Sequence, residues 1–132
     1  MINVSIARSL TKCSKEKHEL LVKNNTERAI RETRKFLMDN IYKYESFIDK
    51  NIMARAEERK NDCYFDGLYS YFFDELNNIA NSIEYVGYSF YGKMSEICDE
   101  FMEDLIERYK VEGFKFDISR DSNIIAFVVS WN

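Results

Sequence analysis

The chain has 132 residues, of which 45% are hydrophobic and 32% are charged, and its formal net charge at pH 7 is −4. This length and this balance fit one globular domain and exclude a disordered chain. The three cysteines, Cys13, Cys63 and Cys98, lie too far apart for a disulfide framework or a zinc site, and no apolar run is long enough to span a membrane. We therefore expect a single cytoplasmic domain over residues 1–132 with no metal and no cofactor.

Charges of opposite sign gather in different parts of the chain. Residues 1–60 carry 14 Lys and Arg against 9 Asp and Glu, whereas residues 61–107 carry 1 against 11. The sequence therefore predicts a molecule with a basic pole and an acidic pole, each of which is a candidate contact surface for a charged partner.

The first sixty residues have the pattern of helices. We expect a short helix over residues 3–11, a second helix that begins at Lys15, and a break at residues 24–26, where Thr26 can cap a third helix. From Thr26 to Lys60 one stripe of apolar residues recurs three, four or seven positions apart. The stripe consists of Ile30, Leu37, Ile41, Tyr44, Ile48 and Ile52.

A helix over residues 26–60 would be about 50 Å long, whereas the radius of gyration of a domain of this size is only about 14 Å. Such a helix would extend beyond its own domain. We therefore expect either a break near residues 39–40 or 49–51, or an unbroken helix whose exposed part packs on a second copy of the chain. The second alternative predicts a homo-oligomer.

The middle of the chain is predicted to contain a joint, a helix and a strand. Residues 61–67 have the composition of a turn-rich joint, and the apolar spacing that follows predicts a helix over about residues 68–83. Residues 85–91 are rich in residues that favour β-structure, so we expect a strand there.

The end of the chain is predicted to form a helix and a hairpin. The helix begins near residues 93–95 and ends before Gly113, and strands follow over residues 114–118 and 124–131 with a turn at 120–123. The predicted fold class is therefore α+β, with long N-terminal helices in residues 1–83 packed on a small βαββ unit in residues 84–132.

Both ends of the sequence resemble a loose group of small phage and prophage proteins of unknown function. The resemblance covers about half of the chain, and the long middle from Lys12 to Glu84 departs from it. It implies a phage origin, and it supplies no active residues to carry over. It rests on the opening Val4-Ser5-Ile6-Ala7-Arg8-Ser9-Leu10-Thr11, on Gly113-Phe114-Lys115-Phe116 after a helix, and on the terminal Ser130-Trp131.

The residue types that common enzyme mechanisms need are scarce. His18 is the only histidine, which removes most general acid–base and Cys–His nucleophile schemes. The four glycines are scattered and form no phosphate-binding loop. We therefore expect a protein that is not an enzyme.

Carboxylates along residues 94–110 form one candidate contact surface. Glu96, Glu100, Glu103 and Glu107 lie four, three and four positions apart, so they share a helix face. This face is either an ordinary solvated surface, a docking face for a basic protein, a mimic of nucleic-acid phosphates, or a divalent-cation site. The carboxylates are spread too far along the helix for a tight metal cage.

Arginine and tyrosine side chains form a second candidate surface. Arg28, Arg31 and Arg34 lie three positions apart, either as an ordinary charged helix face or as a phosphate contact. Sequence-specific DNA binding is disfavoured because the chain is acidic overall and has no large basic patch. Tyrosines that are not needed in the core can stack on a nucleobase, and the candidates are Tyr69, Tyr85, Tyr88 and Tyr91.

These features together predict a non-enzymatic, phage-encoded binding protein. Our interpretation is an antagonist of a host defence that either occupies a host protein or sequesters a small nucleotide ligand. The alternative is a virion structural or assembly component, in which the long helix joins neighbouring subunits.

Overall fold

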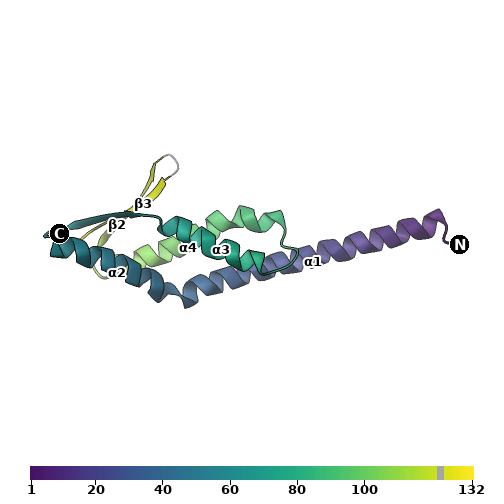
Figure 1. Cartoon of the computed structure of the whole chain (residues 1–132), viewed down its shortest axis with the longest axis horizontal. Helices are drawn as coiled ribbons and strands as arrows, with labels where there is room; N and C mark the ends of the chain where they lie inside the picture. The colour runs from purple at the N-terminus through teal and green to yellow at the C-terminus, as the bar shows by residue number, and fades with distance from the viewer. Residues whose placement is uncertain (122–123) are drawn as a thin grey trace.

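The computed structural model describes residues 1–121 and 124–132, and it confirms the α+β class with long N-terminal helices and a small β-unit (Figure 1). No helix among the described residues combines the length and the apolar character that a membrane crossing needs. The elements in chain order are α1 (Val4–Asp39), α2 (Ile41–Glu57), β1 (Asp62–Asp66), α3 (Leu68–Asn81), α4 (Tyr88–Val111), β2 (Lys115–Asp121) and β3 (Ile124–Ser130).

Helix α1 is one continuous helix of 36 residues, so the predicted short helix over residues 3–11 and the break at residues 24–26 are wrong. The cap of α1 is Asn3, whose side-chain oxygen accepts a hydrogen bond from the Ile6 amide at 2.9 Å. Thr26 caps no new helix, because its hydroxyl instead donates to the Val22 carbonyl oxygen at 2.6 Å. This bond to the preceding turn is typical of a threonine inside a helix.

The break that the sequence predicted near residues 39–40 is confirmed, since α1 ends at Asp39 and α2 begins at Ile41. Asn40 separates the two helices, and its backbone and side-chain N–H groups both donate to the Phe36 carbonyl oxygen, at 3.1 and 2.8 Å. The alternative break near residues 49–51 does not occur, since α2 is continuous from Ile41 to Glu57.

Two predictions for the middle of the chain are wrong. The segment predicted to be a turn-rich joint contains the first strand of the sheet, β1, and residues 85–91, where a strand was predicted, form none. Gly87 is instead the N-cap of α4, and Tyr88 begins the helix. Local β-propensity is overridden here because Phe90 continues the apolar face of α4 and is fully buried. In β1, the alternate residues Cys63 and Phe65 are buried.

The three strands form an antiparallel sheet in the order β1-β3-β2. Phe127 at the centre of β3 lies opposite Phe65 of β1 on one side and Ile118 of β2 on the other. The two C-terminal strands were predicted, but β2 continues to Asp121, so residues 120–121 form strand and the turn predicted there is wrong; residues 122–123 of that turn lie outside the described residues.

Aromatic rings hold the helices together. Tyr44 of α2, Phe72 of α3 and Phe101 of α4 meet edge to face, with ring centroids 4.8 to 5.4 Å apart. Tyr109 and Phe116 continue this packing from α4 onto the sheet, with centroids 5.7 Å apart. Most of the high aromatic content therefore serves the core.

The N-terminal half of α1 lies outside this core and extends away from the body of the protein (Figure 1, purple end). Every residue of α1 from Val4 to Leu21 is exposed, and Thr26 is the first buried one. We call residues 4–21 the arm. At its root, Asn25 donates to the Glu84 carbonyl oxygen at 2.6 Å, and Thr26 accepts from the Gly87 amide at 2.9 Å, which fixes the arm to the body.

Substitution of Gly87 by alanine tests this junction. A Cβ atom at Gly87 would lie 3.0 Å from Val22 and 3.2 Å from Thr26, so Gly87→Ala should lower the free energy of unfolding by about 1–3 kcal/mol. Gly92→Ala is the matched control, because a Cβ atom there meets nothing within 4 Å and alanine favours the helix by about 1 kcal/mol. Urea unfolding measures both changes, and equal effects at the two sites would contradict the close contact.

Candidate functional site

The four glutamates of the predicted acidic face lie on the exposed side of α4. Two of them have partners, because Glu96 pairs with Lys93 at 3.2 Å and Glu100 pairs with Arg34 of α1 at 3.2 Å. Helix α4 packs against α1, so the structure brings the acidic face and the basic helix face together along one seam. The groove in this seam has a volume of only about 120 Å³.

The other predicted arginines lie on the outside of α1. Arg28 pairs with Glu32 one turn away at 2.8 Å, and Arg31 is exposed. Among the described residues, no hydrogen bond or cation–π contact joins Arg28, Arg31 or Arg34 to the predicted tyrosines. The arrangement therefore contains no shared contact from which an arginine–tyrosine nucleotide site could be built.

The four predicted tyrosines separate into two groups. The Tyr69 hydroxyl donates to Asp99 at 3.1 Å, and Arg120 donates to the same carboxylate oxygen at 2.9 Å. These hydrogen bonds hold the Tyr69 side chain against the body of the protein. Burial raises the pKa of Tyr69 to about 12, and the Asp99 charge acts in the same direction. Because it is held in this network, Tyr69 links α3 to α4 and β2.

The second group, Tyr85, Tyr88 and Tyr91, is exposed near the root of the arm. The Tyr85 ring stands edge-on to His18 of the arm, with centroids 5.5 Å apart, and Tyr88 is 93% exposed at the first position of α4. These rings are therefore available for contact with another molecule.

The arm carries an apolar stripe. The side of α1 that faces the body is marked by its buried residues, Thr26, Ala29, Thr33 and Leu37. Because successive residues of a helix are rotated by about 100°, the stripe lies on the opposite side of α1. Leu10 and Leu20 in the stripe are 59% and 57% exposed, which is unusual for residues of this size that lie in a row. The stripe consists of Ile6, Leu10, Cys13 and Leu20.

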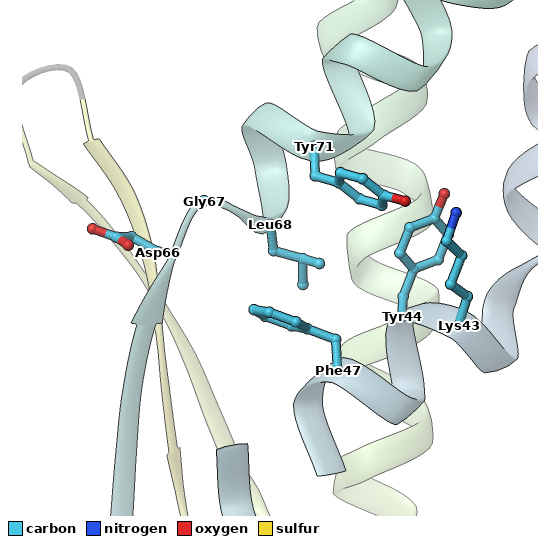
Figure 2. Close-up of a pocket in the computed structure, with 7 residues that line it drawn as sticks. All are labelled: Lys43, Tyr44, Phe47, Asp66, Gly67, Leu68 and Tyr71. Carbon is cyan, nitrogen blue, oxygen red and sulfur yellow. The ribbon is translucent and has the colours of Figure 1, made fainter. Parts of the chain in front are cut away.

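A pocket of about 450 Å³ lies between α2 and the start of α3, where no site was predicted (Figure 2). Gly67 joins β1 to α3 there, and its φ of +82° is a left-handed conformation that favours glycine. The pocket is lined by Lys43, Tyr44, Phe47, Asp66, Gly67, Leu68 and Tyr71.

Sequence reasoning missed this pocket because its walls come from elements that are adjacent only in the folded chain. The available signal was Gly67 within the aromatic run from Tyr64 to Phe73, but the run by itself does not indicate that α2 provides the facing wall.

The cysteines and the histidine do not form a nucleophile and base pair. Cys63 and Cys98 are buried, and burial raises the pKa of the Cys98 thiol to about 12. Cys13 and His18 lie five residues apart on the arm, which turns their side chains about 140° away from each other. Within residues 1–121 and 124–132, no group of three His, Cys, Asp or Glu side chains has a metal-binding arrangement.

Comparison with known proteins gives no match to a protein-family model, to a curated protein or to a solved structure.

Thiol labelling tests the environments of the three cysteines. At pH 8 a thiol reagent such as Ellman's reagent should react rapidly with one thiol per chain, because only Cys13 is exposed and the buried Cys98 stays protonated. Cys13→Ser should abolish the rapid phase, and all remaining thiols should react in denaturant. Rapid reaction of a second thiol in the native protein would contradict the buried positions of Cys63 and Cys98.

Proposed function

We propose that this chain is a non-enzymatic binding protein that works as a dimer, in which two copies pair through their arms. The observation that carries the proposal is the arm itself, in which eighteen consecutive helical residues are exposed and an apolar stripe has no cover among the residues that the structure describes. Helices in water gain most of their stability from packing of an apolar face. A partner surface on the stripe supplies that packing.

The spacing of the stripe supports a second copy as the partner. Ile6, Leu10, Cys13 and Leu20 lie four, three and seven positions apart, as the seam positions of a coiled coil do, and Lys17 fills the place between Cys13 and Leu20. A single polar residue in such a seam restricts the register and the number of helices. Two copies offer each other the same stripe, which is the condition for a twofold dimer.

Charge and shape favour an antiparallel pair. In a parallel pair Lys17 would face its own copy, and so would Arg31 further along the same side of α1, which costs free energy through like-charge repulsion. An antiparallel pair avoids this repulsion. It also places the exposed, apolar tip with Ile2 and Val4 beside the root of the partner's arm.

The pairing bears on the two predicted biological roles in different ways. A virion or assembly component needs self-association, so the arm favours that role. An antagonist that occupies a host protein needs an additional surface, for which the acidic face of α4 is our proposal. The phage origin and the nucleotide ligand stay predictions.

Light scattering of the purified protein tests the dimer. We expect a mass of about twice 15.8 kDa. Leu10→Lys should raise the dissociation constant of the dimer about a hundredfold or more, because the substitution removes a large apolar contact and adds charge in both copies. Thr11→Lys is the matched control. It introduces the same charge at the next residue in the sequence, which lies on the side of α1 that faces the body and not on the stripe, so the mass should be unchanged. A monomeric wild-type protein would refute the proposal.

Cross-linking tests the antiparallel orientation in a Cys13→Ser background. Leu10 lies opposite Leu20 in the register we propose, so Ile6 lies opposite Asn24 of the other copy. A short bismaleimide should therefore link Ile6→Cys to Asn24→Cys only when the two variants are mixed, since Cys63 and Cys98 are buried. Efficient linking of Ile6→Cys to itself would show a parallel pair instead.

A further inference from the structure

We propose that the pocket between α2 and α3 is a binding site for a small aromatic carboxylic acid. This inference is independent of the dimer, because the pocket lies on the body and the arm does not line it. Its volume of about 450 Å³ falls within the roughly 300–1,000 Å³ that is typical of small-molecule sites.

One part of the pocket is apolar and suits a planar hydrocarbon group. The Phe47 and Leu68 side chains face each other across it, and the Tyr44 and Tyr71 rings form the adjoining wall (Figure 2). Aromatic side chains pack on a ligand ring edge to face or in an offset stack, each contact adding to the area that is removed from water. The body of the ligand is therefore expected to be a single ring or a small fused ring system.

The other part of the pocket gathers hydrogen-bond donors. The Lys43 ammonium and the hydroxyls of Tyr44 and Tyr71 point toward the same end (Figure 2). Lys43 Nζ lies 5.2 Å from the centroid of the Tyr71 ring and 3.3 Å from a Glu75 carboxylate oxygen. Hydrogen bonding to Tyr71 and to Glu75 raises the pKa of Lys43, so its ammonium stays charged at neutral pH.

This end holds one charge of each sign, Lys43 and Glu75, and Lys43 is the group that can bind an anionic part of a ligand. An ammonium has three donor protons, and Glu75 takes one, so Lys43 keeps donors for a second acceptor. The Asp66 carboxylate points away from the pocket (Figure 2) and does not oppose an anion there. The first turn of α3 lacks a side-chain cap and borders the pocket at its apolar part, beside Leu68 and Phe47 (Figure 2).

The Tyr44 hydroxyl provides the second, independent observation. Tyr44 is only 1% exposed, and its hydroxyl has no hydrogen-bond partner among the described residues. A buried hydroxyl without a partner is unfavourable, and phenylalanine would fill the same space without that cost. A carboxylate that enters the pocket and draws the flexible Lys43 head away from Tyr71 gives this hydroxyl an acceptor.

Amide chemical shifts of the ¹⁵N-labelled protein, titrated with phenylacetate, test the site. We expect saturable shifts at Gly67 and Leu68, and at least about tenfold weaker binding of phenylacetamide, which has the same shape without the charge. Absence of saturable shifts at these amides, or equal binding of the amide and the acid, would overturn the proposal.

Two substitutions separate a binding role of the Tyr44 hydroxyl from a structural one. Tyr44→Phe should weaken phenylacetate binding about tenfold while the protein stays folded and at least as stable, because only an unpaired hydroxyl is lost. Tyr88→Phe removes a hydroxyl from a ring that is 93% exposed, and it should change neither property. Unchanged phenylacetate affinity of Tyr44→Phe would refute the role of Tyr44 in the site.

Discussion

The packing of three rings, Tyr44, Phe72 and Phe101, determines how the helices of this protein are arranged. Each ring comes from a different helix, and each meets the other two edge to face within 5.4 Å. Edge-to-face contacts restrict both the separation and the angle of the elements that carry them. The rings therefore fix α2 against α3 and α4, and the sheet is joined to the same helices through Tyr109 and Phe116.

Both candidate surfaces follow from this arrangement. The Tyr44 ring belongs to the core and also lines the pocket, so the pocket has a rigid wall on that side. The body that forms around the rings is shorter than α1, whose 36 residues exceed the 24 of α4 and the 14 of α3. The core can cover only the C-terminal part of α1, so the apolar stripe of the arm has no cover among the described residues.

Part of the fold was predictable because the relevant forces are local. The apolar face of α4 and the two C-terminal strands follow from residue spacing, and the break at Asn40 is one of the two positions that the sequence indicated. The failures occurred where local preference competes with packing. The segment 85–91 favours a strand by composition, yet Phe90 gains more from full burial in α4.

The α+β class, the exposed acidic side of α4 and the shortage of catalytic side chains were predictable from the sequence, because each depends on composition or on spacing along one element, and the break near residues 39–40 was one of the alternatives it indicated. Contacts between elements decided that Tyr69 donates a hydrogen bond to Asp99, that the apolar stripe of the arm is uncovered among the described residues, and that Lys43, Tyr44 and Tyr71 meet in a pocket. These features depend on contacts between α1, α2, α3 and α4, and the spacing of residues along one helix carries no information about the neighbour against which that helix packs.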